Sequence, residues 1–296
     1  MRGSIHAPAG IWRAFFIFAA LGVTRLAAGT APSSNQAPAP YLQFGQPDQE
    51  EGKQALAVFR RAGIPGEYFL EFDLRVMPRR GDERVLRGRL WGSRNEQGAV
   101  TRIAVTGDGK LERRLLIQNG EDAKVWCVDV GASSSTTRMV DGFEPLLPGV
   151  ELTAFELQMP YIYWPDATLE RLVRVRSRPS HVFFFRPPVA WAAQHPDVSG
   201  VRAYLDTQFN VPVQTEVIGQ DGKVLRTLSL VDLKKVGEQY IPKTIDLRND
   251  RTRDKVRFQV TGAALDLKLA PAVFSPAQLT EDVASPPRAR VLGIAP

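Results

Sequence analysis

The chain has 296 residues and a formal net charge of +6, with 38 basic and 32 acidic side chains. Residues 1–28 contain three arginines and no acidic residue, so the rest of the chain carries only about three excess positive charges. So small an excess, without a basic stripe that carries aromatic side chains, argues against nucleic acid as a partner. Cys127 is the single cysteine, so no internal disulfide can form and the fold must depend on its hydrophobic core.

The first thirty residues have the order of a secretory signal. Two arginines precede an apolar run (residues 14–23), and small residues follow at positions 27–29. A membrane-spanning helix needs about twenty apolar residues, so we expect residues 1–29 to be a cleaved signal peptide, with an uncleaved anchor as the alternative. No cysteine lies near the cleavage zone, so we do not expect the exported protein to be lipid-anchored. The polar, proline-rich residues 30–46 are typical of a linker.

A helix and then five strands follow. Residues 47–61 are predicted to be helical, because apolar residues recur at helical spacing, acids occupy the first turn, and Gly63 and Pro65 come next. Alternation of apolar and polar residues then predicts strands over 68–76, 85–91, 99–105, 111–118 and 123–130. Cys127 lies in the last of these and is expected to be a small core side chain rather than a reactive thiol.

The segment of about residues 150–192 differs from both of its flanks. Between Phe155 and Trp191 it contains eight aromatic residues, and five prolines prevent one long element. Short helices are predicted near 152–157 and 169–173. We expect a helical, aromatic insert that covers the mouth or the concave face of a sheet. It is either a permanent plug of the core or a lid over a ligand, and the two roles are compatible.

Five more strands are predicted after the insert, over residues 201–210, 211–217, 224–230, 239–247 and 256–260. The turns between them are too short for crossover helices, so the strands must form an antiparallel meander. The expected fold is mainly β (α+β), one domain over residues 47–282 with about ten or eleven strands. Residues 283–296 are expected to form a flexible tail.

No catalytic or metal-binding pattern is present in the sequence. There is no G-x-S-x-G elbow and no phosphate loop, and His181 and His195 have no clustered ligands at recognised metal spacing. Glu71 and Asp73 share a strand face but alternate with apolar residues, as on a solvated outer face. We therefore predict no catalytic residue, no metal and no cofactor.

The aromatic content indicates binding instead. A concave sheet can bury an apolar ligand, at about 0.8 kcal/mol for each methylene covered. For any one of these side chains an ordinary core position is the alternative. The residues predicted to line such a cavity are Trp91, Trp126, Phe155, Met159, Trp164, Phe183, Phe184 and Phe185.

The distal strands carry a family resemblance over residues 201–279. Its motifs are Val211-Pro212-Val213-Gln214, Gln220-Asp221-Gly222-Lys223, Tyr240-Ile241-Pro242-Lys243-Thr244-Ile245 and Val273-Phe274-Ser275-Pro276-Ala277-Gln278-Leu279. This pattern resembles the LolA-like periplasmic outer-membrane lipoprotein-sorting proteins. The resemblance implies an unclosed β-barrel with helices over its concave face, used in that family to shield lipoprotein acyl chains. It assigns no individual binding residue.

Three functions follow as hypotheses. The first is a periplasmic, non-enzymatic carrier or chaperone for an acyl chain or another lipid-like moiety. Its partners would be a lipoprotein or lipid and the transport components of the inner and outer membranes. The second is an envelope scaffold that binds another protein through a face or edge of the sheet. The third, a lipid or glycan hydrolase, requires a nucleophile or acid with an oriented partner inside the concave face.

Overall fold

The computed structural model describes residues 46–295 except 108–110, 132–134, 177 and 209–210. The predicted signal peptide and residues 30–45 of the predicted linker lie outside the described residues. The helices are α1 (Gln49–Arg61), α2 (Ala154–Gln158) and α3 (Val189–Gln194), with the 3-10 turns η2 (Pro160–Tyr163), η3 (Pro271–Phe274), η4 (Pro276–Gln278) and η5 (Arg288–Arg290).

Fourteen strands are formed by the described residues. They are β1 (Glu67–Met77), β2 (Arg84–Asn95), β3 (Gly98–Thr106), β4 (Glu112–Gln118), β5 (Lys124–Val130), β6 (Arg138–Val140), β7 (Asp166–Val175), β8 (Arg178–Arg186), β9 (Val198–Asp206), β10 (Pro212–Gly219), β11 (Val224–Val236), β12 (Gln239–Asn249), β13 (Lys255–Leu267) and β14 (Leu292–Gly293).

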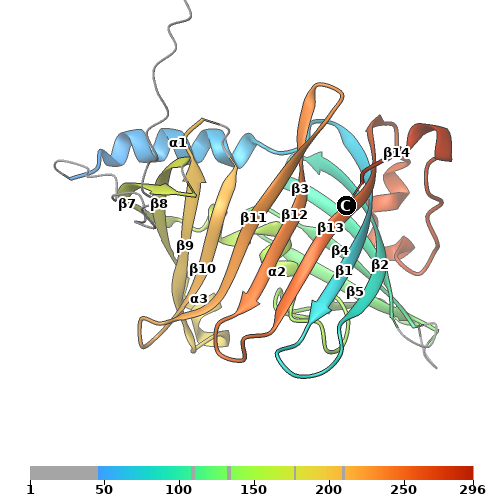
Figure 1. Ribbon diagram of the computed structural model, residues 1–296, viewed down its shortest axis with the longest axis horizontal. Coiled ribbons are helices and arrows are strands. Elements are labelled where there is room, and N and C mark those ends of the chain that lie inside the picture. The colour runs from blue at the N-terminus through green and yellow to red at the C-terminus, as the bar shows by residue number, and fades with distance from the viewer. Residues whose placement is uncertain (1–45, 108–110, 132–134, 177, 209–210, 296) are drawn as a thin grey trace, which may run out of the picture. The chain divides into compact units, whose positions relative to one another are not determined.

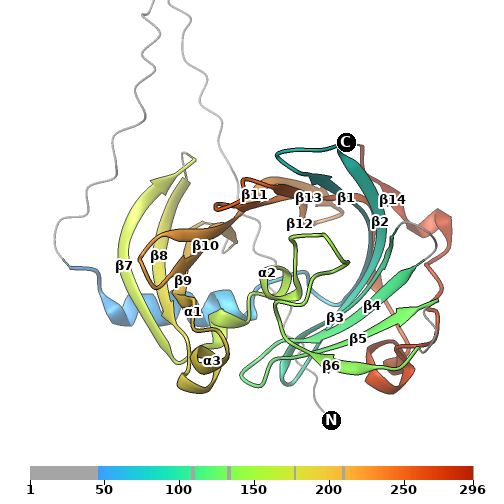
Figure 2. The ribbon, with the colours of Figure 1, turned by 90° about the horizontal axis from the view of Figure 1, so that it is seen from below.

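All strands belong to one antiparallel sheet in the order β6-β5-β4-β3-β2-β1-β13-β12-β11-β10-β9-β8-β7, with β14 beside β13. Strands β6 and β7 are the two ends of this path and do not pair, so the sheet is not closed into a barrel. Figures 1 and 2 show it as an open arch with α2 inside the curve. The mainly β fold with an unclosed sheet, an N-terminal helix and an aromatic insert is confirmed.

The five proximal and five distal strands lie where alternation predicted them. The additional strands are β6, β14 and the pair β7 and β8, which fall in the predicted insert. The helix expected at residues 169–173 is wrong, because this segment belongs to β7. A register shift between Leu169 and Arg171 interrupts the alternation of β7, which made the spacing of its apolar residues resemble a helix.

Helix α1 begins at the N-cap Asp48, whose side chain accepts a hydrogen bond from the Glu50 N–H at 2.8 Å. Its buried residues Leu56 and Phe59 pack into the apolar cluster of the distal strands. Gln49 and Gly52, also on this helix, contact Leu169 of β7. The helix therefore covers the β7 end of the sheet.

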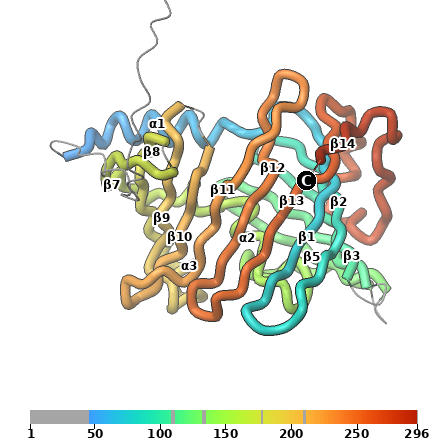
Figure 3. Tube along the Cα trace, viewed as in Figure 1, coloured from blue at the N-terminus to red at the C-terminus, as the bar shows by residue number. Residues whose placement is uncertain are grey.

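The C-terminal segment (residues 268–295) covers the outer face of the proximal strands. Figure 3 shows it lying alongside β1 and β2. Its Val273 and Leu279 are buried against outward-facing side chains such as Phe69 and Leu116. Arg102 of β3, only 1% exposed, holds the segment by donating to four of its carbonyl groups.

The last described residues of the chain contact the sheet. Leu292–Gly293 pair with β13, the Ile294 N–H donates to the Thr261 carbonyl at 2.8 Å, and Ile294 is 4% exposed. Residues 287–290, which precede this contact, are exposed. One apolar side chain and one edge pairing therefore attach residues 292–294 to β13.

Candidate functional site

The concave side of the distal strands holds a cluster of aromatic side chains. Phe183 and Phe185 of β8 point inward, and Phe155, Tyr161 and Trp164 approach them from the insert. The ring centroids of Tyr161 and Phe185 are 5.5 Å apart, and those of Phe155 and Tyr161 are 5.6 Å apart. All five side chains are at most 7% exposed. We call these five residues the aromatic cluster.

The local backbone of the insert explains how these rings are brought together. A capping box starts α2, because the N-cap Thr153 and Glu156 bond to each other's backbone and side chains. Met159 takes a left-handed conformation with φ of 50°, and Pro160 starts the turn η2 directly after it. The resulting reversal places Phe155 and Tyr161 on the same side of the insert.

The concave side of the proximal strands is filled by the chain itself. Leu146, Leu147, Val150 and Leu152, each at most 3% exposed, pack against the inward side chains of β1–β5. Cys127 lies in the same cluster, is fully buried, and burial raises the pKa of its thiol. The segment of residues 146–152, which leads into the insert, therefore fills the concave side of the proximal strands.

A pocket of about 320 Å³ opens beside the aromatic cluster. Its apolar wall comes from Val198, Val217 and Leu225, which point inward from β9, β10 and β11, and from Phe143. Phe143 stacks on Phe155 with 4.4 Å between the ring centroids, so the pocket adjoins the buried rings. Its size is at the lower end of the range for small-molecule sites.

Helix α3 ends at this pocket, and its last residue Gln194 belongs to the lining. None of its six residues is buried, and Trp191 contacts the aromatic cluster, with ring centroids 4.9 Å from Trp164 and 5.7 Å from Phe155. His195 stacks on Trp191 at 3.9 Å, with Nδ1 3.0 Å from the Trp191 carbonyl and Nε2 3.0 Å from a carboxylate oxygen of Asp141. Trp191 and His195 therefore attach this exposed helix beside the pocket.

A buried ion group lies at the rim of the same pocket. The guanidinium of Arg226 donates to Glu156 at 2.6 Å and to Glu151 at 3.1 Å, and lies 5.7 Å from the ring centroid of Phe143. Burial opposes the charge of Arg226, but the two carboxylates outweigh it and raise the pKa of the guanidinium. The charged guanidinium of Arg226 therefore links α2 to β11 through Glu156.

Five of the eight predicted lining residues meet at this place. Phe155, Trp164, Phe183 and Phe185 belong to the aromatic cluster, and Met159 packs against it.

The other three lie on the outer face. Trp91 packs on Phe69 under the C-terminal segment, and Trp126 packs beside Leu279. Phe184 lies beneath the guanidinium groups of Arg186 and Arg202. In each case the buried neighbour one residue away points inward, so the period of two sends these rings outward.

Sequence reasoning missed Phe143, His195, Leu225 and Arg226 as residues of the pocket. Phe143 is isolated in the sequence, and Leu225 and Arg226 look like ordinary strand residues. None of the four lies in the aromatic-rich segment, which ends at Trp191.

The described residues contain no group of three or more His, Cys, Asp or Glu side chains that could hold a metal ion. His181 and His195 lie on different elements and have different acidic neighbours, Glu51 and Asp141. In the part of the chain that the structure describes, no helix combines the length and the apolar character needed to cross a membrane.

An open antiparallel sheet with helices on its concave side is the fold that the sequence resemblance implied. Solved structures of other proteins share it. A domain from Vibrio parahaemolyticus named for outer membrane lipoprotein sorting matches with a TM-score of 0.66 at 14% identity, covering 79% of this chain and 100% of that domain. A DUF1329 family protein from Desulfovibrio piger matches with a TM-score of 0.64 at 11% identity, covering 78% and 98%.

A LolA superfamily protein from Nitrosomonas europaea matches with a TM-score of 0.59 at 12% identity, covering 75% of this chain and 96% of that protein. A family model described only as an uncharacterized protein matches residues 194–281. None of the curated proteins compared matches the chain. At these identities the likeness shows the fold, and at that level the predicted LolA-like resemblance is confirmed.

Proposed function

We propose that the protein is a non-enzymatic carrier of the periplasm that holds an acyl chain against the aromatic cluster. The observation that supports this most is the pocket bounded by Phe143 and Leu225, which adjoins the buried rings beside the exposed helix α3. The lipoprotein-sorting name of the relative from Vibrio parahaemolyticus supports a lipid-linked cargo. Membrane components that load and unload the cargo belong to the same proposal.

Binding of a chain requires side chains to move, because the concave face is filled. Helix α3 costs least to displace, since it has no buried residue and only Trp191 inserts among the rings. Loss of an aromatic contact costs about 0.5–1.5 kcal/mol, whereas each methylene that enters gains about 0.8 kcal/mol. A chain of about eight methylenes therefore outweighs the loss of two or three ring contacts.

The test is titration of the protein without its signal peptide with a fluorescent fatty acid. Leu225→Trp would fill the pocket and is expected to weaken binding about tenfold or more. Val231→Trp, on the same strand but 46% exposed, is the matched control and should bind as the parent does. Absence of uptake by the parent, or equal binding by both variants, would contradict the proposal. Mass spectrometry of lipid extracted from the purified protein would identify the cargo.

A further inference from the structure

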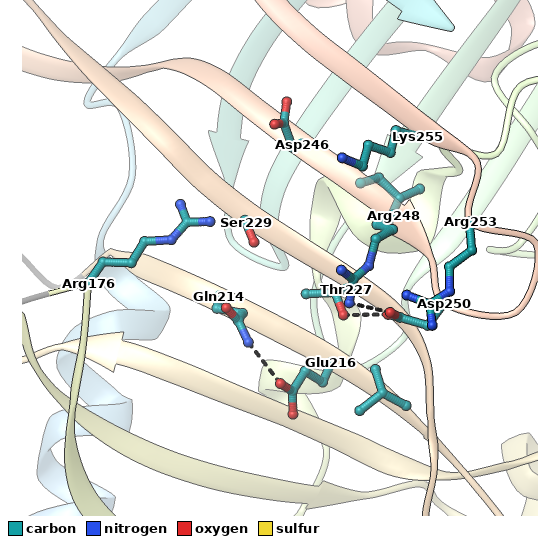
Figure 4. Close-up of a pocket in the computed structure, with 12 residues that line it drawn as sticks. Arg176, Gln214, Glu216, Thr227, Ser229, Asp246, Arg248, Asp250, Arg253 and Lys255 are labelled. Carbon is teal, nitrogen blue, oxygen red and sulfur yellow. Dashed lines mark hydrogen bonds and ion pairs between the residues drawn. The ribbon is translucent and has the colours of Figure 1, made fainter. Parts of the chain in front are cut away.

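A second cavity, of about 540 Å³, lies on the outer face of the distal strands, away from the aromatic cluster. Its floor consists of side chains that alternate with inward-pointing residues such as Leu228 and Leu247. Figure 4 shows polar side chains from β10, β11 and β12 side by side on this floor. Nothing in the proposed carrier function uses it.

The pairing between β10, β11, β12 and β13 arranges the polar side chains of the floor in two rows. One row runs across neighbouring strands through Gln214, Ser229 and Asp246, and the next through Glu216, Thr227, Arg248 and Lys255. Neighbouring strands are about 4.8 Å apart, so each row sets a line of polar groups at a spacing that a small polar ligand can span. Within each row the residues are paired directly across neighbouring strands, and the two rows are two residues apart along each strand. All of these side chains therefore lie on the same face of the sheet.

The acidic groups of the cavity are already neutralised by arginines. Asp246 pairs with Arg257 at 2.7 Å, Asp250 pairs with Arg248, and Glu216 lies 3.6 Å from Arg202. Gln214 and Tyr204 also donate to Glu216, at 2.8 and 3.2 Å. None of these carboxylates is therefore left to attract a cation.

Three cationic side chains remain in the wall. Arg176, Arg253 and Lys255 line the cavity, and among the described residues none of them pairs with a carboxylate. Arg176 donates to the Leu230 carbonyl at 2.9 Å, which directs its guanidinium to the edge of the floor. They come from the β7–β8 turn, the β12–β13 turn and β13, so separate elements bring positive charge to one place.

Two further features of the cavity suit a ligand. Arg176 and Arg253 have left-handed backbones, with φ of 49° and 71°, a conformation that costs a non-glycine residue about 1 kcal/mol or more and often accompanies ligand sites. Ser229 lines the cavity between Gln214 and Asp246, so a hydroxyl group is available there to a polar ligand.

We propose that this cavity binds a phosphate group carried by a small polar molecule. Arginine recognises phosphate oxygens through paired N–H donors, and Lys255 adds a point charge. The cavity is larger than one phosphate ion fills, so the remainder of an ester would lie over Ser229 and Gln214. The phosphate comes either from a soluble ester or from the headgroup of an anionic lipid.

Calorimetric titration of the full chain without its signal peptide tests this, with glycerol 3-phosphate as the soluble probe and glycerol as its uncharged counterpart. Arg253→Gln and Lys255→Gln are each expected to weaken glycerol 3-phosphate binding about tenfold. Arg251→Gln removes the same charge from the same turn but lines the other pocket, so its affinity should stay within about twofold of the parent. Circular dichroism would verify that each variant is folded.

Sedimentation with phosphatidylglycerol vesicles, against phosphatidylcholine vesicles, tests the lipid source. Vesicle binding that both cavity variants lose and Arg251→Gln keeps, without binding of glycerol 3-phosphate, would assign the headgroup. Failure of both probes, or binding that Arg251→Gln weakens as much as the cavity variants, would overturn the proposal. Because the cavity lies on the opposite face of the sheet, these results are independent of fatty-acid uptake.

Discussion

The side chain of Gln49 makes to Leu169 the two hydrogen bonds that a neighbouring strand would make. Its Nε2 donates to the Leu169 carbonyl at 2.9 Å, and its Oε1 accepts the Leu169 N–H at 3.1 Å. Strand β7 is the last strand of the sheet on this side, and backbone groups at a sheet edge are templates for pairing with another chain. The Gln49 side chain satisfies the backbone N–H and carbonyl groups at one position of this edge, Leu169.

Gln49→Ala should therefore lower the free energy of unfolding by about 1–2 kcal/mol and increase self-association at high concentration. Urea denaturation and light scattering measure the two effects. Gln54→Ala, on an exposed position of the same helix, is the control and should change neither. Equal behaviour of the two variants would show that the edge is not protected by this amide.

Gly52 allows the close approach of α1 to β7. A Cβ built on Gly52 would lie 2.9 Å from the Leu169 Cβ, closer than real contacts of this kind. Replacement of glycine by alanine in a helix normally gains about 1 kcal/mol, but here the contact should reverse the sign. Gly52→Ala is expected to destabilise the protein in chemical denaturation.

The same contact can be tested by a double-mutant cycle. Leu169→Gly removes all three side-chain atoms that the new Cβ meets, so Gly52→Ala should be less harmful, or stabilising, in that background. Additive effects of the two substitutions would contradict the steric explanation.

Arg102 holds the C-terminal segment by donors that no apolar side chain can replace. It donates to the carbonyls of Val273, Gln278, Leu279 and Glu281, and burial lowers its pKa to about 10, so it remains charged at neutral pH. Arg102→Met should cost about 3 kcal/mol, because buried carbonyls lose their partners. Arg87→Met, exposed on β2, should cost little, and equal losses in thermal unfolding would argue against this role.

The end of the chain is expected to contribute to stability. Ile294 is 4% exposed, whereas Leu292, two residues earlier, is 49% exposed. Ile294→Asp would bury an unpaired carboxylate and should lower the melting temperature by several degrees, and Leu292→Asp should leave it nearly unchanged. Rapid cleavage of residues 283–296 by a protease, without loss of stability, would contradict this contribution.

The fold could be predicted largely because its strands are regular. Each hairpin pairs neighbours in sequence, so alternation along β9–β13 and the short turns define most of the sheet. The prediction failed at β7, where the register shift beside Leu169 breaks the period of two. The site was predicted in part: the aromatic-rich segment identified Phe155 and Trp164, but it did not distinguish inward rings from outward ones.

The sequence by itself determined the class of fold, the aromatic character of the insert and the lack of recognised catalytic patterns, because these depend on local periodicity and composition. The tertiary structure decided which face each ring occupies, where the chain end packs, and which polar groups share one cavity. Phe143 beside Phe155, and Ser229 between Gln214 and Asp246, are neighbours only through strand register and insert packing. Such pairings depend on residues far apart in the chain, and local patterns carry no record of them.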